Sequence, residues 1–116
     1  PPHAEIHKTA LGAEDSVEWK HYGSAMEAVQ ELHAAGFEVY ALEQVEGSVS
    51  LNDFVPENGK KYAIVLGNEV KGVAQEVVDA CDGALEIPQF GTKHSLNVSV
   101  SGGIAIWHFA KSLLGL

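Results

Sequence analysis

Arginine is absent from the sequence, and basic residues of any kind are few. All seven basic residues are lysine, whereas 16 residues are Asp or Glu, which gives a formal net charge of −9 at pH 7. Surfaces that bind nucleic acid broadly are normally basic. The composition therefore argues against such a surface, although it leaves room for a local basic pocket or for a basic segment of a partner.

Cysteine and long apolar runs are also scarce. The one cysteine, Cys81, cannot form an internal disulfide, which fits a reducing, cytoplasmic environment. It falls on the apolar face of an expected helix, so we predict a buried structural thiol rather than a nucleophile. No apolar run reaches the roughly 18 residues of a membrane span, and the first residues lack the basic-then-apolar order of a signal peptide.

The usual metal-binding patterns are missing as well. Six histidines are present, and His3 and His7 have a spacing of four residues. However, the sequence has no His-Glu-x-x-His motif and no pair of cysteines near a histidine. We therefore expect no metal site.

What the sequence does contain is an alternation of strand and helix patterns. With 116 residues and 46% hydrophobic content, the chain can form one domain with its own core. The capping box that starts at Ser24 begins a helix, and Gly36 ends it. The nearly continuous apolar run Lys61–Leu66 is typical of a central strand of a parallel sheet. The other expected elements are strands at 17–22, 37–42 and 83–87, a helix whose buried face carries Val73, Ala74, Val77, Val78 and Cys81, and a helix from about 95 to 114.

Two segments are expected to lack regular structure. Residues 1–13 begin with two prolines, which favour extended chain, and contain Gly12, which favours a turn. Residues 43–58 are polar, and only a weak turn is expected at 51–54. The whole pattern predicts an α/β fold, a parallel sheet with helices on both faces.

The last expected helix is apolar on nearly every side. One stripe contains Val100, Ile104, Trp107 and Lys111, and other faces contain Ala105, Ile106, Phe109 and Ala110. A helix of this kind is buried on more than one side. In so small a domain, the additional buried side predicts a subunit interface.

Unusual residues lie at the ends of three expected strands. In open α/β sheets, ligands bind outside the carboxyl ends of the strands. Here these ends carry Ala41-Leu42-Glu43, Leu66-Gly67-Asn68-Glu69 and Ile87-Pro88-Gln89. Residues 67–72 match neither a phosphate-binding P-loop nor a dinucleotide-binding motif. Taken alone, Gly67 is explained as a turn glycine, and Glu69 as an acid favoured by the helix dipole.

The beginning of the last helix leaves two interpretations open. Helix starts carry unpaired backbone N–H groups and a partial positive charge. Ser95 and Asn97 lie at this position, where their side chains can cap the helix or face a ligand. The residues alone do not decide between the two.

Three segments together resemble a known family. The stretch YAIVLGNEVKGV at 62–73, the Ile87-Pro88 step and SLNVSVSGGIAIW at 95–107 occur in order and with family-like spacing. They resemble the second and third motifs of the SpoU-type (TrmH-like) RNA 2′-O-ribose methyltransferases, which belong to the SPOUT superfamily. KTALGAEDSVEW at 8–19 is also similar to the family. The resemblance covers nearly the whole chain and is strongest from 61 to 107.

The resemblance implies a fold and a cofactor. The fold would be an α/β-knot, a deep trefoil knot in which residues 87–97 pass through the loop after the strand at 61–66. S-adenosylmethionine would lie bent in the knot, and a missing Cβ would let the backbone at Gly67 approach it. The cofactor-binding positions would be Leu42, Leu66, Gly67, Ile87, Gln89 and Leu96. Family members are homodimers, which fits the many-sided last helix.

The implied reaction moves a methyl group from a sulfonium to a ribose 2′-OH of tRNA or rRNA. A 2′-OH is a poor nucleophile, so it needs proton removal or strong orientation. The resemblance assigns catalytic roles to Asn68 and Glu69 in the second motif and to Ser95 and Asn97 in the third. The catalytic arginine of the family belongs to an earlier motif, and this sequence contains none. We therefore expect residues 1–116 to be a single SpoU-type domain that lacks its N-terminal strand–helix unit.

Two alternatives remain open. The chain could be a module of the same fold that binds the cofactor or dimerises without catalysis. It could also be an unrelated small α/β fold in which Ser95-Leu96-Asn97-Val98-Ser99 merely starts a helix. Binding of S-adenosylmethionine separates the last possibility from the others, and methyl transfer to RNA separates an enzyme from a module.

Overall fold

The fold is a six-stranded sheet with helices on both faces. The computed structural model describes residues 5–10, 16–21, 24–67, 72–88 and 98–115, and within these ranges the strand order is β2-β1-β5-β3-β6-β4. The strands are β1 (Glu5–Ala10), β2 (Ser16–His21), β3 (Phe37–Leu42), β4 (Val49–Ser50), β5 (Lys61–Leu66) and β6 (Gly83–Glu86). β5, β3, β6 and β4 are parallel, as expected for an α/β fold.

The N-terminal part of the sheet differs from the expectation. β1 pairs antiparallel with both β2 and β5, so the sheet is mixed rather than wholly parallel. The prediction that residues 1–13 lack regular structure is wrong for Glu5–Ala10. A strand at this position forms by pairing with β5, more than 50 residues further along the chain. The residues of β1, EIHKTA, do not alternate strictly between apolar and polar, so the local pattern gave no strand signal there.

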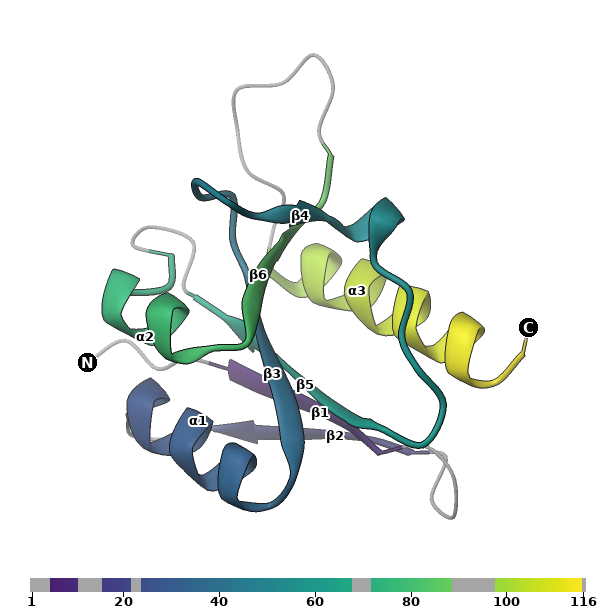
Figure 1. The fold of residues 1–116 in the computed structure, drawn as a ribbon, viewed down its shortest axis with the longest axis horizontal. Coiled ribbons are helices and arrows are strands. Elements are labelled where there is room, and N and C mark those ends of the chain that lie inside the picture. The colour runs from purple at the N-terminus through teal and green to yellow at the C-terminus, as the bar shows by residue number, and fades with distance from the viewer. Residues whose placement is uncertain (1–4, 11–15, 22–23, 68–71, 89–97, 116) are drawn as a thin grey trace.

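Helices cover the two faces of the sheet unequally. α1 (Ala25–Ala34) and α2 (Gln75–Ala80) lie on one face, and α3 (Val98–Leu113) lies on the other (Figure 1). Successive side chains of β3 and β5 point to opposite faces. One set contacts α1 and α2 and includes Val39, Ala63 and Val65, and the other lies on the α3 side and includes Tyr62, Ile64 and Leu66. The two-sided burial explains the continuous apolar run of β5.

The first helix confirms the local signals of the sequence. Ser24 is the N-cap, and its Oγ accepts a hydrogen bond from the Glu27 N–H at 3.3 Å. Ala35 is the C-cap, and Gly36 follows it with φ +88, the left-handed conformation that glycine adopts without strain. The capping box and the terminal glycine therefore set both ends of α1.

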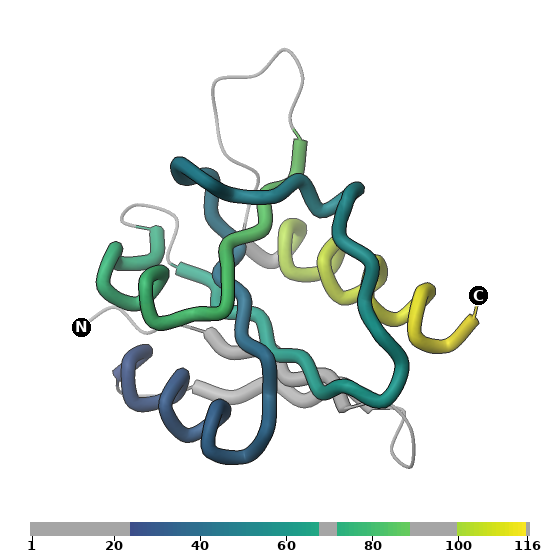
Figure 2. Tube along the Cα trace, in the orientation of Figure 1, coloured from purple at the N-terminus to yellow at the C-terminus, as the bar shows by residue number. Residues whose placement is uncertain are grey.

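The connection between β3 and β5 lies against α3. It contains β4 and a short 3-10 helix, η1 (Leu51–Asp53), where only a weak turn was expected. Figure 2 shows the connection running alongside α3 before it enters β5. The His108 Nε2–H of α3 donates to the Phe54 carbonyl at 2.6 Å. Four aromatic rings fill the space between these elements, from Tyr40, Phe54, Tyr62 and Phe109.

The long C-terminal helix has a buried face and an exposed apolar face. Ala105 and Phe109 are 0% and 1% exposed and face the sheet. Val100, Ile104 and Trp107 are 51%, 39% and 58% exposed, so this stripe is open in the isolated chain. Of the helices that the structure describes, none combines the length and apolarity needed to cross a membrane.

Candidate functional site

The carboxyl ends of three parallel strands meet at one edge of the sheet. Leu42, the last residue of β3, is opposite Leu85 of β6. Ala41 is opposite Val65, which places Leu42 level with Leu66 at the end of β5. Ile87 follows β6 directly. The sheet therefore brings four predicted cofactor-binding residues to the same edge, since Gly67 follows Leu66.

The side chains at this edge form an apolar wall. Leu66 is 3% exposed, and Leu42 and Ile87 are half-buried in the same hydrophobic cluster. Such a wall with backbone groups beside it suits a flat aromatic heterocycle, whose faces pack on apolar side chains while its nitrogens bond to the backbone. The adenine of S-adenosylmethionine has this character, so the described residues fit the cofactor that the family resemblance implies.

Gly67 lies so close to the backbone of two later residues that no side chain fits there. A Cβ added to Gly67 would lie 2.0 Å from the Gly72 carbonyl carbon and 2.5 Å from the Val73 nitrogen. The family resemblance implied that a missing Cβ at Gly67 lets the backbone approach a ligand. The structure gives a different reason, because the backbone of Gly72 and Val73 occupies the space that a side chain would need.

Glu43 joins this edge through contacts that sequence reasoning missed. The Val73 N–H donates to Glu43 Oε2 at 2.8 Å, and the Glu43 N–H donates to the Leu85 carbonyl at 3.0 Å. The sequence marked Glu43 as an unusual residue at a strand end but gave it no role. Its partner Val73 is 30 residues away, so no local pattern could identify the contact.

A hydrogen bond between two side chains lies at the same edge, near β4. The Ser48 hydroxyl donates to Glu86 Oε1 at 2.7 Å. Ser48 directly precedes β4, and Glu86 is the last residue of β6. The pair holds the start of the long connection against the end of β6, beside the predicted cofactor-binding positions.

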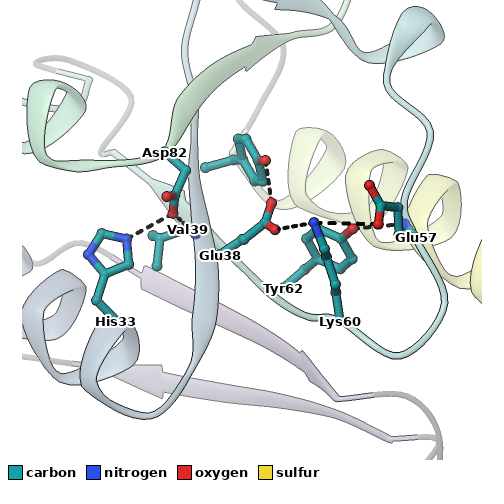
Figure 3. A network of polar contacts seen from close by, with 8 residues as sticks. His33, Glu38, Val39, Glu57, Lys60, Tyr62 and Asp82 are labelled. Carbon is teal, nitrogen blue, oxygen red and sulfur yellow. Dashed lines mark hydrogen bonds and ion pairs between the residues drawn. The ribbon is translucent and has the colours of Figure 1, made fainter.

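A polar network lies away from this edge (Figure 3). Lys60 precedes β5 and pairs with Glu38 at 2.8 Å, and Asp82 precedes β6. The Asp82 carboxylate accepts from the Val39 N–H at 2.7 Å and from His33 Nε2 at 2.8 Å. Lys60 and Asp82 stand before β5 and β6, so the network lies at the opposite ends of these strands from the predicted site.

The ionisation of the network follows its hydrogen bonds. The Lys60 ammonium and then the Tyr40 hydroxyl, which both donate to Glu38, hold the pKa of that carboxyl below its usual value. Burial and the neighbouring Glu38 raise the pKa of Tyr40 well above its usual range. The Tyr40 hydroxyl therefore stays protonated and donates its hydrogen bond at any neutral pH.

Cys81 has the environment of a structural thiol. It is half-buried at the C-cap of α2 and packs against the clusters on the α1 side. Burial, with a smaller effect of Asp82, raises the pKa of the thiol to about 11. A thiol that stays protonated is a poor nucleophile. In the ranges that the structure describes, no group of three or more His, Cys, Asp or Glu side chains is arranged to hold a metal ion.

Six of the ten predicted site residues lie outside the described residues. They are Asn68, Glu69, Gln89, Ser95, Leu96 and Asn97. The predicted knot crossing and the predicted start of the last helix before Val98 fall there too. The described part of the site therefore consists of the strand ends and of Glu43 and Val73.

Comparisons with known proteins add independent information. The profile described as "SpoU rRNA Methylase family" matches residues 1–107. The chain is 37% identical over 90 residues to the tRNA (guanosine(18)-2'-O)-methyltransferase TARBP1 of Mus musculus, which covers 77% of this chain and 6% of that protein. It is 30% identical over 112 residues to the 23S rRNA (guanosine-2'-O-)-methyltransferase RlmB of Xanthomonas axonopodis pv. citri, covering 97% of this chain and 44% of the relative.

One solved structure is similar to this chain in both fold and sequence. The crystal structure of the TrmH/SpoU tRNA modifying enzyme of A. aeolicus superposes with a TM-score of 0.68 at 30% identity. The superposition covers 78% of this chain and 45% of that chain. The chain thus spans less than half the length of each of these three proteins.

Proposed function

The chain belongs to the SpoU rRNA methylase family, and on this premise we propose that it is part of an RNA 2′-O-ribose methyltransferase. The enzyme transfers a methyl group from S-adenosylmethionine to a ribose 2′-OH of tRNA or rRNA. The similarity to a tRNA (guanosine(18)-2'-O)-methyltransferase and to a 23S rRNA (guanosine-2'-O-)-methyltransferase supports this activity. The first relative is named for tRNA and the second for rRNA, so the proposed substrate is either tRNA or rRNA.

The observation that carries the proposal is the convergence of three strand ends. Leu42, Leu66 and Ile87 come from β3, β5 and the residue after β6, and they share one apolar cluster. A ligand at this edge lies outside the carboxyl ends of parallel strands, the usual binding place in such sheets. In the proposed mechanism these residues bind the cofactor and exclude water.

The chemistry requires an acceptor hydroxyl aligned with an electrophilic methyl group. The bound cofactor supplies that methyl group from its sulfonium. Asn68, Glu69, Ser95 and Asn97 are proposed to orient the ribose and to hold its hydroxyl in line. The hydroxyl proton needs an acceptor or a strong orienting charge. Since the chain contains no arginine, we propose that the catalytic arginine of the family comes from residues outside this sequence.

Further parts of the proposal concern architecture. The chain is proposed to form one SpoU domain without its first strand–helix unit, to carry the trefoil knot of the family and to act in the cytoplasm. It is also proposed to form a homodimer, because an apolar stripe of α3 is exposed in the isolated chain. An intact mass of the purified protein well above 12.4 kDa would support the incomplete domain.

Binding and transfer test the function in two steps. Calorimetry with S-adenosylmethionine measures binding, and labelled donor with bulk RNA measures methyl transfer by the full-length protein. We expect Asn97→Ala to lower transfer on the order of 100-fold, because misplaced reacting groups lose rate steeply. Asn58→Ala is the matched control, since Asn58 is exposed and precedes β5 at its amino end.

Each outcome separates the candidate functions. Transfer to RNA by the parent protein supports the enzyme, and binding without transfer identifies the non-catalytic module. No binding by the parent protein would exclude both. Equal losses in Asn97→Ala and Asn58→Ala would show that the site assignment is wrong while leaving the activity itself intact.

A further inference from the structure

We propose that Glu43 is a positioning residue of the methyl-transfer site. Its carboxylate accepts a hydrogen bond from the backbone N–H of Val73, six residues after Gly67 in the sequence. The segment between Gly67 and Val73 carries the predicted catalytic residues Asn68 and Glu69 in the sequence. The inference rests on the proposed function and adds to it a residue that belongs to neither signature motif.

The contact itself is short and partly shielded from water. Glu43 Oε2 accepts from the Val73 N–H at 2.8 Å, and the bond is part-buried. A hydrogen bond between a backbone N–H and a carboxylate is charge-assisted and stronger than one between neutral groups. The bond also satisfies a backbone donor next to α2, whose N-cap residue Ala74 offers no side-chain cap.

The backbone of Glu43 is hydrogen-bonded as well as its carboxylate. Glu43 directly follows β3, and its N–H donates to the Leu85 carbonyl of β6 at 3.0 Å. The residue therefore joins β3, β6 and the segment after β5. These are the three strand ends that form the candidate cofactor edge, so Glu43 links the segment to the rigid sheet.

Two glycines make room for this arrangement. Gly72 has φ +66, and a Cβ there would lie 2.5 Å from Glu43 Oε2. A Cβ on Gly67 would lie 2.0 Å from the Gly72 carbonyl carbon. Only residues without side chains allow the two ends of the segment to meet beside the carboxylate.

Fixing both ends of a short segment limits the conformations of the residues between them. Asn68 and Glu69 lie between Gly67 and Val73 in the sequence, and the proposal is that the Glu43–Val73 bond helps to hold them for the reaction. Methyl transfer needs an acceptor held close to and in line with the methyl group. Loss of the anchor should therefore reduce the rate of the chemical step more than the affinity for the cofactor, because Leu42, Leu66 and Ile87 remain on the sheet.

The decisive variants change the acceptor at position 43. Glu43→Ala removes it, Glu43→Asp shortens the side chain by one methylene, and Glu43→Gln keeps an oxygen of the same reach. We expect Glu43→Ala and Glu43→Asp to lower kcat roughly ten- to a hundredfold and to change the KM for S-adenosylmethionine only a few-fold. Glu43→Gln should restore most of kcat. Glu46→Ala is the matched control, an exposed acid three residues along the same connection.

A second readout follows the contact without any reaction. Amide hydrogen exchange of the ligand-free protein should speed up at Val73 in Glu43→Ala and Glu43→Asp but not in Glu43→Gln. Glu43→Asp keeps the charge and most of the volume, so it serves if Glu43→Ala does not fold. The urea midpoint of each variant shows whether a loss of rate merely follows a loss of stability.

The outcomes distinguish this inference from the proposed function. If the parent protein transfers methyl groups and Glu43→Asp keeps its kcat despite faster exchange at Val73, Glu43 is not a positioning residue. If Glu43→Gln keeps exchange at Val73 slow but is as low in kcat as Glu43→Ala, the hydrogen bond to Val73 does not set the rate, and the inference is wrong. If the parent protein itself transfers nothing, the proposed function fails, and this inference falls with it.

Discussion

At the scale of single residues, Asp82 shows how one side chain ties three elements together. It precedes β6, and it accepts hydrogen bonds from the Val39 N–H of β3 and from His33 at the end of α1. Val39 is fully buried, so its N–H has no access to water. Burial of the carboxyl would raise its pKa, but the hydrogen bonds from Val39 and His33 outweigh this effect and lower the pKa below its usual value of 3.8.

Replacing Asp82 should therefore cost stability in a way that depends on pH. A carboxyl with a lowered pKa contributes stability that is complete above its usual pKa and is lost as the pH falls through the lowered value. We expect Asp82→Ala to reduce the free energy of unfolding at pH 7 by about 1–3 kcal/mol, because a buried N–H loses its acceptor. Urea unfolding between pH 7 and pH 2 measures both effects.

The control is Asp82→Asn, whose Oδ1 can still accept from Val39 but carries no charge. It should retain part of the stability at pH 7 and lose the part of the acid dependence below about pH 4 that belongs to this carboxyl. A pH profile of Asp82→Asn identical to that of the parent protein would contradict the assignment.

At the scale of elements, predictions from local signals agree with the structure at β3, β5 and α1. They are wrong at the start of α2, because this helix begins at Gln75, so Val73 and Ala74 precede it and Ala74 is exposed. The strands 37–42 and 61–66 have the predicted bounds, and α1 begins after Ser24 as the capping box indicates. The two faces of α3 were predicted less completely. The sequence showed that the helix is apolar nearly all round, but only its packing shows that Phe109 enters the core and Trp107 does not.

The buried face of α3 should carry most of its contribution to stability. Phe109 is 1% exposed and packs against Phe54 and Tyr62 with ring centroids at 5.4 and 5.1 Å. We expect Phe109→Ala to lower the free energy of unfolding by about 3–5 kcal/mol, because it removes buried contacts and leaves a cavity. Phe109→Leu, which keeps much of the volume, should cost clearly less. Thermal unfolding of both variants tests this, and similar losses would mean that the ring is not tightly packed.

At the scale of the whole molecule, the exposed stripe of α3 is the proposed dimer interface. Val100, Ile104 and Trp107 follow one another at spacings of four and three residues, which places them on one side of the helix, and each is more than a third exposed. Large apolar side chains gathered on one surface usually mark an interaction site. A homodimer that buries this stripe accounts for apolar side chains which the sheet does not cover.

A charge placed in the stripe should shift the monomer–dimer equilibrium. We expect Trp107→Glu to weaken the proposed dimer by about 2 kcal/mol or more, which is roughly a 30-fold higher Kd. Sedimentation velocity over a range of concentrations measures the shift. Ala34→Glu adds the same charge on the exposed end of α1, on the opposite face of the sheet, and should leave assembly unchanged. A parent protein that stays monomeric throughout would refute the proposal.

The sequence by itself determined where most helices and strands lie and which residues follow the strands. Apolar periodicity, caps and terminal glycines act between neighbours in the chain, so Ser24, Gly36 and the apolar run of β5 could be interpreted without coordinates. The rule that ligands bind at strand carboxyl ends also placed Leu42, Gly67 and Ile87 at one edge.

Only the tertiary structure decided how distant segments meet. It paired β1 with β5, it placed Glu43 against Val73, and it filled the space beside Gly67 with the chain's own backbone. The first two of these contacts join residues 30 or more positions apart, which meet only because of the order of strands in the sheet. That order is set by the global packing of the core rather than by any short stretch of sequence, so local patterns carry no signal for it.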